Sequence, residues 1–457
     1  MFNVVDTYFA GRLSTDALAA LSLSFPVFFM FVAIGSGFAT GTTALIGQAL
    51  GAGDRRRASL IGAQGIVLAG VLGVASSALG FLAVPHLFRL LGAEGAYLAT
   101  CLQYMNVILG GAALMFGVHM LNGVLNAQGD TRTFRDALIM ACALNVVLDP
   151  WFMFGGLGLP PLGIGGLALA TIVAQMFSFA LMAHRVRRTG LLDRDAGARW
   201  RPDPAVLGAI AHQGLPAGGN MMTMALGVFV ITWFLGQVSH QAVAAYGVAT
   251  RIEQMMLLPA IGLNVATLTL SAQNGGARRF DRVRQAVRTA LGAGAVLMVC
   301  GGILLLLLAR PLMDAFTDDP AVVAIGARYL RIAAFIGFAY IILFVNTSAL
   351  QGLKRPALAL WIGLARQIVA PVLVFGLATR VWGLGLDGIW WGIFGITWAA
   401  ALAAVVLARR EVAQAERAAH RDDAAATSDA HQRGALTNPA AAGATPAGSS
   451  HAGPTTA

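Results

Sequence analysis

Two carboxylates stand in stretches of this sequence that are otherwise apolar. Asp149 lies in LNVVLDPWFMFG and Asp6 in NVVDTYFAG, and Asn145 precedes Asp149 by four residues. Residues four apart share one face of a helix, so we expect the Asn145 and Asp149 side chains to point the same way. Carboxylate and amide oxygens on one apolar face are suited to bind a cation or a proton.

The residues around Asp149 add to this site. Pro150 has no backbone N–H, so it leaves the carbonyl one turn back without its usual donor and tends to kink the helix. We expect a helix hinge at Pro150. Thr171, in GGLALATIVAQ of the next apolar run, would add a hydroxyl. The predicted cation or proton site therefore comprises Asp6, Asn145, Asp149 and Thr171, and sodium is the one metal ion it would hold.

A purely structural role is the alternative for these acids. Asp149 would then be a protonated, hydrogen-bonded packing residue, and Asp6 would lie near a helix end in headgroup water. An ionised aspartate at the centre of a membrane span costs about 2.5–3.5 kcal/mol on insertion scales. Acids inside spans are therefore uncommon and usually functional, which favours the ion site.

Glu253, in ATRIEQMM, is the only acid inside the second span of the C-terminal half. A coupling role and a structural ion pair explain it equally well. Arg251 lies closest in sequence, and the candidate partners are Arg251, Arg328, Arg331 and Arg366.

The elements that carry these residues are membrane spans. The chain has 457 residues, of which 57% are hydrophobic and 11% charged, and its mean hydropathy is +0.72. A bilayer span needs about 20 apolar residues. Before Gly11 only about ten apolar residues remain, half of one span, so we expect the first of twelve helices to be truncated and the true start to lie upstream. Eleven complete runs are present: 17–48, 60–84, 98–126, 136–154, 164–183, 205–235, 242–272, 285–308, 323–351, 357–379 and 387–408.

Basic residues collect in alternate loops. One set of loops carries 20 Lys and Arg residues and the other carries 4. Because short cytoplasmic loops accumulate Lys and Arg, the first set and both termini are predicted to be cytoplasmic, in a bacterial inner membrane. This sorting explains the net charge of +10 without nucleic acid. The predicted domains are an N-terminal six-helix lobe (1–184), a cytoplasmic linker (185–203), a C-terminal six-helix lobe (204–410) and a disordered cytoplasmic tail (411–457).

The two halves are repeats of one another. With an offset of 225 residues, 15 of the 48 positions from Val5 to Ala52 are identical, including Gln48 with Gln273 and Gly51 with Gly276. Both matched loops are arginine-rich, so the repeats are parallel, an architecture of transporters. The acids are not repeated, and the shared scaffold therefore does not require them: Asp6 pairs with Ile231, Asn145 with Ile368 and Asp149 with Val372.

The stretches NVVDTYFAGRLSTDALAALSL, QALGAGD and LNVVLDPWF together resemble the multidrug and toxic compound extrusion (MATE) family, in its prokaryotic DNA-damage-inducible (DinF-like) branch. The resemblance covers residues 1 to about 409 and implies an all-α membrane protein of twelve helices, in two six-helix lobes that form a V-shaped cleft. It implies export of drugs or other amphiphilic or cationic organic compounds in exchange for protons or sodium. It also implies an ion site in the N-terminal lobe, at Asp6, Asn145, Asp149 and Thr171.

The ion site that another branch of the family has in its C-terminal lobe is not expected in this chain. Another branch has acidic ion-site residues in its seventh and tenth helices, and neither 206–235 nor 323–351 contains an acid.

The alternative function is a flippase for lipid-linked precursors, known in the wider superfamily. We expect no enzyme, because no HExxH or GxSxG motif is present. We also expect alternating access, a monomer, and no cofactor beyond the coupling ion.

Overall fold

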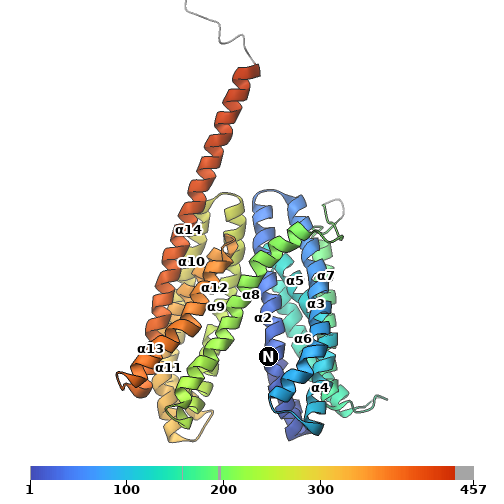
Figure 1. Ribbon diagram of the computed structural model, residues 1–457, viewed down its shortest axis with the longest axis vertical. Coiled ribbons are helices and arrows are strands. Elements are labelled where there is room, and N and C mark those ends of the chain that lie inside the picture. Colours follow the sequence, from blue (N-terminus) through green and yellow to red (C-terminus); the bar gives the residue numbers. More distant parts are fainter. Residues whose placement is uncertain (1, 157, 194–196, 438–457) are drawn as a thin grey trace, which may run out of the picture.

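The computed structural model describes residues 2–156, 158–193 and 197–437, and this part of the chain is almost entirely helical (Figure 1). Between α6 and α7 a single isolated bridge joins Gly156 and Leu159. In chain order the helices are α1 (Phe2–Leu13), α2 (Thr15–Gly51), α3 (Arg55–Leu90), α4 (Gly95–Gly110), α5 (Ala112–Ala127), α6 (Arg132–Phe154), α7 (Gly163–Arg188), α8 (Pro204–Gly236), α9 (His240–Gly276), α10 (Phe280–Asp314), α11 (Pro320–Gly352), α12 (Pro356–Leu364), the π-helical turn η2 (Ala365–Val369), α13 (Ala370–Arg380) and α14 (Gly385–Thr437).

The helices are long and apolar enough to span a membrane. Within the described residues ten spans pass this test, and α4 with α5 forms an eleventh if the pair, bent by 47°, counts as one. The segment from α12 through η2 to α13 counts as a single span, Pro356–Arg380. These eleven spans and the short α1 confirm the predicted all-α, twelve-helix membrane fold.

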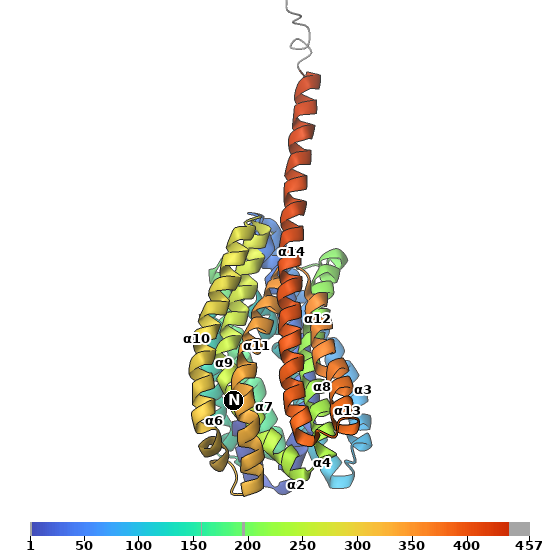
Figure 2. The same ribbon diagram turned by 90° about the vertical axis from the view of Figure 1, so that its left-hand side faces the viewer.

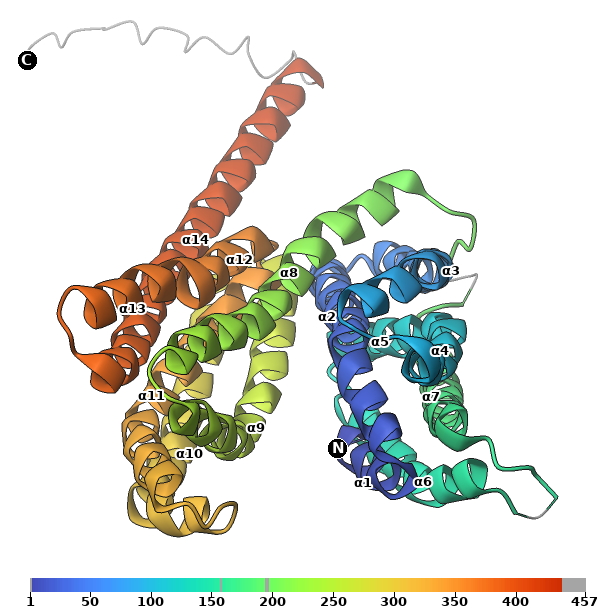
Figure 3. The ribbon, with the colours of Figure 1, turned by 60° about the horizontal axis from the view of Figure 1, so that its bottom comes forward.

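The helices form two bundles. Figure 1 shows α2 to α7 on the right and α8 to α14 on the left, and α1 lies with the first group in Figure 3. The two bundles adjoin at the end that carries the α2–α3 and α9–α10 turns and diverge toward the other end. We call the end that carries these two turns the arginine-rich end, after Arg55 and Arg278 in the turns.

Glycines let α2 and α8 approach closely where the two bundles meet (Figure 3). A Cβ atom added at Gly41 would lie 2.8 Å from the backbone nitrogen of Gly214, and one added at Gly37 would overlap the backbone of Gly218. Small residues at facing positions allow backbones in a membrane to come within van der Waals contact. The glycine spacing of α2 therefore positions the two bundles against each other.

The repeated Gln48 and Gln273 close the arginine-rich end. The Gln48 side-chain amide donates to the Gly352 carbonyl oxygen at 2.8 Å, and that of Gln273 donates to the Ala127 carbonyl oxygen at 2.7 Å. Each hydrogen bond joins one bundle to the other, and the two donors are equivalent in the repeat. The motif shared by the two halves is therefore used where the halves meet.

Two repeated glycines lie beside these glutamines. A Cβ atom at Gly51 would overlap the carbonyl oxygen of Gln273, and one at Gly276 would overlap that of Gln48. Only glycine fits a backbone approach this close. We call the hydrogen bonds of Gln48 and Gln273, with Gly51 and Gly276, the Gln-Gly closure.

Equivalent serines start α2 and α9. Ser14 accepts a hydrogen bond from the Ala17 backbone N–H at 3.0 Å, and Ser239 accepts one from that of Ala242 at 3.1 Å. Both serines have an extended backbone, with φ of −168° and −166°. Such an N-cap contributes about 1 kcal/mol to a helix, and here it fixes where the long second helix of each repeat begins.

The end of α14 corrects the predicted disordered tail. Residues 411–437 continue α14 as a helix that projects past the bundles in Figure 2. Its first turns are tied down by ion pairs, Arg355 with Glu411 at 3.0 Å and Arg284 with Glu416 at 2.8 Å. The alanine content that suggested low complexity also gives a high helix propensity. The rest of the predicted tail, 438–457, lies outside the described residues.

The pair of Arg284 and Glu416 predicts a pH dependence for this helical extension. The hydrogen bond from Arg284 lowers the pKa of Glu416 below its ordinary value. A carboxyl group whose pKa is lower in the folded state than in the unfolded state stabilises the folded state at pH values above its unfolded-state pKa. The contribution of Glu416 is therefore present at neutral pH and is lost as the pH falls through its folded-state pKa. We expect protection factors for amide hydrogen exchange in 411–425 to fall on acidification. Glu416→Gln should show the reduced protection already at neutral pH, whereas the distant Glu94→Gln should not; equal protection in Glu416→Gln and the unmodified chain would contradict this.

Candidate functional site

Three of the predicted ion-site residues come together inside the N-terminal bundle. Asn145 and Asp149 lie one turn apart on α6, and Asp6 reaches them from α1. The Asn145 side-chain amide donates to Asp6 Oδ1 at 3.4 Å. Asn145 and Asp149 are 0% exposed and Asp6 is 2% exposed. The structure thus joins residues 139 positions apart in the sequence.

The oxygen atoms of this cluster are short of partners. Both carboxyl oxygens of Asp149 and Oδ1 of Asn145 are buried without a hydrogen bond among the described residues. The Asp149 and Asp6 carboxyls nevertheless lie within hydrogen-bond reach of each other, which two carboxyl groups can use only when they share a proton. Two buried carboxylates cannot both stay ionised without a compensating cation or proton. The cluster is therefore a candidate site for a bound cation or a shared proton.

Thr171 and Pro150 flank the cluster without joining it. Thr171 is buried on α7, but its hydroxyl donates to the Leu167 carbonyl oxygen at 3.3 Å, one turn back in the same helix. Pro150 lies inside α6, which continues to Phe154. The helix is thus not interrupted at this proline, and its role as a hinge remains a prediction.

Tyr104 is a member of the site that the sequence analysis did not select. It lies on α4, is 3% exposed, and is close enough to Asp6 and Asp149 for both charges to act on it. Its counterpart at the repeat offset of 225 is Tyr329, so the repeat contained a signal for it. Both halves keep a buried tyrosine beside an acid, although the acids themselves are not equivalent.

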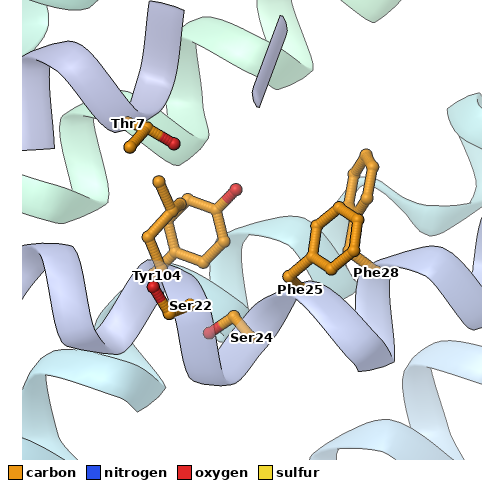
Figure 4. A pocket seen from close by; sticks show the side chains of 7 residues that line it. Thr7, Ser22, Ser24, Phe25, Phe28 and Tyr104 are labelled. Atoms are coloured by element: carbon orange, nitrogen blue, oxygen red, sulfur yellow. The ribbon is translucent and has the colours of Figure 1, made fainter. Parts of the chain in front are cut away.

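A cavity of about 240 Å³ opens next to Tyr104 (Figure 4). In Figure 4, Thr7 lies above Tyr104, Phe25 and Phe28 stand to one side, and the Tyr104 hydroxyl points into the space between them. Thr7 follows Asp6 directly, so the cavity and the carboxyl cluster share one wall. The full lining is Thr7, Leu21, Ser22, Ser24, Phe25, Phe28 and Tyr104.

The C-terminal bundle contains a second buried acid. The Tyr329 hydroxyl donates to Glu253 Oε2 at 2.8 Å, while Glu253 Oε1 is buried without a partner among the described residues. Arg251, its expected partner, is exposed and forms no ion pair within that part of the chain. The cation whose charge reaches Glu253 is Arg366. Of the four candidate partners named from the sequence, Arg366 is therefore the one whose charge reaches Glu253.

Arg366 lies on the π-helical turn η2, between α12 and α13. It is 6% exposed, its guanidinium lies 5.1 Å from the centre of the Tyr340 ring, and its Nε has no partner among the described residues. No salt bridge joins it to Glu253 in the same part of the chain. Single π-helical turns occur frequently at functional sites, which makes this arginine a candidate for substrate or coupling chemistry.

The donor atoms of the N-terminal cluster decide which ions it suits. Among the described residues no group of three or more His, Cys, Asp or Glu side chains could hold a metal ion. The unpartnered oxygens of Asn145 and Asp149, with the Asp6 carboxyl, are hard oxygen ligands. Such atoms fit sodium, and a carboxyl group among them can equally take a proton.

Comparison with known proteins decides the family. The MatE family model matches residues 1–151 and 216–375, and these ranges include Asp6, Asn145, Asp149 and Glu253. The chain belongs to the MATE family. The curated relatives of this family member include the FAD transporter of Shewanella oneidensis, 30% identical over 84% of this chain and 85% of that protein. Another is the probable multidrug resistance protein YoeA of Bacillus subtilis, 29% identical over 70% of each chain.

Solved structures agree with this assignment. A crystal structure of MATE in the bent conformation has a TM-score of 0.84 and 25% identity, and it covers 91% of this chain and 92% of that one. The straight conformation gives a TM-score of 0.82 with the same coverage. This MATE family member is therefore a multi-span membrane transporter of small molecules, and its relatives include multidrug resistance proteins and no enzyme among those named here.

Proposed function

We propose that this MATE family member is a secondary active antiporter that exports drugs and other amphiphilic or cationic organic compounds in exchange for protons or sodium, by alternating access. The observation that carries the proposal is the buried cluster of Asp6, Asn145 and Asp149, in which the Asn145 amide donates to Asp6 and the Asp149 oxygens accept no hydrogen bond from another kind of group among the described residues. An unpaired carboxylate at this depth is costly unless a cation or proton is bound. Loading and unloading of the site therefore change the stability of the surrounding helices.

The neighbouring cavity supports the link between ion and substrate. Tyr104 lies close to the Asp6 and Asp149 charges and also lines the cavity with Phe25 and Phe28. Aromatic rings bind flat amphiphiles and attract cations through their faces. A substrate in this cavity and an ion at the carboxyl cluster would compete through Tyr104 and Thr7 without direct contact.

The Gln-Gly closure supports alternating access. Gln48 and Gln273 hold one end of the two bundles together through two hydrogen bonds related by the repeat. In this form the protein would be closed at the arginine-rich end. Breaking the two hydrogen bonds and separating Gly51 from Gln273 would open that end.

The orientation follows from the loop charges. We assign the arginine-rich end to the cytoplasm because Arg55, Arg278 and their neighbours would obey the positive-inside pattern there. The described form would then be closed toward the cytoplasm. In a bacterial inner membrane a monomer in this orientation, with both termini inside, can use the inward proton or sodium gradient.

A second candidate function is export of an anionic compound. Arg366 is a buried cation with an unpartnered Nε in the C-terminal bundle, and the relative from Shewanella oneidensis is named a FAD transporter. A fixed guanidinium suits a carboxylate or phosphate group. This candidate would be favoured if FAD competed with ethidium for export by the unmodified chain and if Arg366→Gln abolished that competition.

Glu253 is proposed as an additional coupling residue. Glu253→Gln removes the ionisable group and keeps an oxygen for the Tyr329 hydroxyl. We expect gradient-driven export to fall by roughly 5- to 10-fold, the lower part of the usual range of coupling between sites. Tyr329→Phe, which removes the hydrogen bond and keeps the acid, should retain more activity. Full export by Glu253→Gln would assign the residue a structural role.

The experiment that tests the proposed function is ethidium efflux from energised cells that express the chain. The proton gradient and the sodium gradient are collapsed separately, with a protonophore and by removal of external sodium. Loss of efflux with the protonophore alone supports proton coupling, and loss only without sodium supports sodium coupling. Efflux independent of both gradients would contradict the antiporter, and an absence of efflux would favour the flippase for lipid-linked precursors.

A further inference from the structure

A cavity of about 620 Å³ lies directly over the Gln-Gly closure, at the arginine-rich end. The N-terminal bundle contributes Asp54 and Arg57, and the C-terminal bundle contributes Arg278 and Lys354. The helical extension of α14 covers one side with Asp422 and three alanines, and Gln48 and Gly276 of the closure belong to the lining. Both bundles and the extension therefore meet around one space.

The charges around this cavity are not balanced. Arg278 is 3.6 Å from Asp422 and also pairs with Asp423, and Asp54 accepts a hydrogen bond from the Arg57 backbone N–H at 2.9 Å. In the part of the chain that the structure describes, the Arg57 and Lys354 side chains have no ion pair. The lining therefore has three cations and two carboxylates, and Arg57 and Lys354, one from each bundle, line it without an ion pair within that part of the chain.

Lys354 shows that these cations repel each other. Burial lowers the pKa of Lys354, and the neighbouring charge of Arg57 lowers it further. Closure of the arginine-rich end brings the two charges together, so the closed form carries an electrostatic penalty. An anion between them would convert this repulsion into attraction to a shared partner.

The backbone holds two of the cations in an unusual conformation. Arg278 has φ of 57° and Lys354 has φ of 61°, and they are the two non-glycine residues with positive φ in the described chain. The repeat equivalent of Arg278 is Gly53, which has φ of 77°. The C-terminal half therefore has a strained cation where the N-terminal half has glycine. Such strain persists where the surroundings or function require it.

The positive-inside pattern does not account for this arrangement. That pattern concerns the number of cations in a loop and is satisfied wherever in the loop they lie. It does not explain why unpaired cations from opposite bundles face a common cavity above the surfaces that close.

We propose that this cavity binds a phosphate group, between Arg57 and Lys354, and that the bound phosphate holds the arginine-rich end closed. The phosphate belongs either to an anionic lipid headgroup or to a free phosphate compound. Charge-assisted hydrogen bonds from arginine and lysine to phosphate oxygens are strong and directional. The binding step stands on the cavity alone, and the effect on transport rests on the proposed alternating access.

The test compares phosphate binding by the purified full-length chain and by variants. Thermal unfolding is followed in neutral detergent with inorganic phosphate and with chloride at equal ionic strength. A second arm uses phosphate-free nanodiscs of phosphatidylcholine with and without phosphatidylglycerol. We expect phosphate or phosphatidylglycerol to raise the unfolding temperature. For the arm that responds, the Arg57→Gln/Lys354→Gln double variant should weaken binding by about tenfold or more, the loss of at least one charge-assisted hydrogen bond.

Two matched variants make the outcome decisive. Arg132→Gln removes an exposed cation at the same end that does not line the cavity, and it should bind like the unmodified chain. Lys354→Arg keeps the charge and should retain binding, which shows that loss in the double variant is not a folding defect. A response to free phosphate assigns a soluble ligand, and a response only to phosphatidylglycerol assigns a lipid headgroup.

Equal stabilisation by chloride, an unchanged double variant, or no response in either arm would each overturn the proposal. Ethidium efflux by the unmodified chain is measured in parallel. Absence of efflux together with phosphate binding would refute the exporter and leave the phosphate site standing, so the two failures are distinguishable.

Discussion

Gradient-driven export will fall to background in Asp149→Asn. Asparagine has nearly the same size as aspartate but cannot bind a proton or balance a cation, so the cluster with Asp6 and Asn145 would lose its ion-dependent charge. Coupling between two sites is typically about 1–3 kcal/mol, which corresponds to about 5- to 150-fold. We expect the upper part of this range because the buried Asp149 carboxyl interacts directly with that of Asp6, so the pair needs a proton or cation. The measurement is ethidium efflux at matched protein levels in the membrane.

Asp136→Asn is the matched control for this prediction. Asp136 lies on the same helix, α6, but is exposed and pairs with Arg135 at 2.8 Å. Exposed pairs of this kind contribute little, so export should be unchanged. Retained gradient-driven export in Asp149→Asn would refute the proposed role of the N-terminal cluster, whatever the control shows.

A side chain at Gly51 will hold the arginine-rich end open. In Gly51→Val the Cβ atom would overlap the carbonyl oxygen of Gln273, so the closed form loses the contact on which the Gln48 and Gln273 hydrogen bonds depend. Overpacking typically costs about 1–3 kcal/mol. The balance between closed and open forms should shift by about 5- to 150-fold, and export should fall because the cycle stops in one form.

The measurement is the distance between spin labels at positions 132 and 288, in a chain whose three native cysteines are replaced. The labels stand on opposite bundles at the arginine-rich end, so the distance should increase in Gly51→Val. Gly70→Ala and Gly292→Ala serve as controls, because a Cβ atom at either glycine would meet nothing within 4 Å. An unchanged distance in Gly51→Val, or equal increases in the controls, would contradict the closure.

The fold was predictable because a bilayer imposes strong rules on sequence. Every backbone polar group in the membrane must be paired within a helix, so the apolar runs directly identify spans. The repeat offset of 225 paired Gln48 with Gln273, but only the structure shows that both form hydrogen bonds between the bundles. The composition led to a wrong prediction for residues 411–437, which continue α14 as a helix. The alanines of this segment suggest low complexity, whereas ion pairs such as Arg284 with Glu416 hold it as a helix.

The site was only partly predictable. The sequence shows which residues are energetically costly in an apolar span, but it does not show which side chains contact one another. Asp6, Asn145 and Asp149 were selected because acids are costly in apolar runs, and the structure brings them together. Tyr104 costs little in a membrane and was not selected on cost; the repeat pairs it with Tyr329, and its proximity to the acids shows that it belongs to the site. Arg366 was one of four candidate partners of Glu253, and the fold was needed to single it out because no sequence spacing relates two residues 113 positions apart.

The two halves divide their tasks in a way that follows from the repeat. Positions that the halves share, such as Gly51 and Gly276, form the closure, where a two-fold relation makes both halves contribute equally. Ionisable groups differ between the halves, with two acids in one bundle and Glu253 with Arg366 in the other. The repeated positions thus serve the contact between the bundles, while the proposed ion site lies in the N-terminal bundle alone.

The most direct test of the ion site is the reverse of export, in liposomes that contain only the purified chain. An imposed ethidium gradient, with no ion gradient at the start, should drive protons or sodium in the opposite direction. Internal pH and radioactive sodium are followed in parallel vesicles. The proposed mechanism predicts counter-movement of one of these ions and its disappearance in Asp149→Asn. Ethidium flux without movement of either ion would contradict antiport and, with it, the proposed role of Asp6, Asn145 and Asp149.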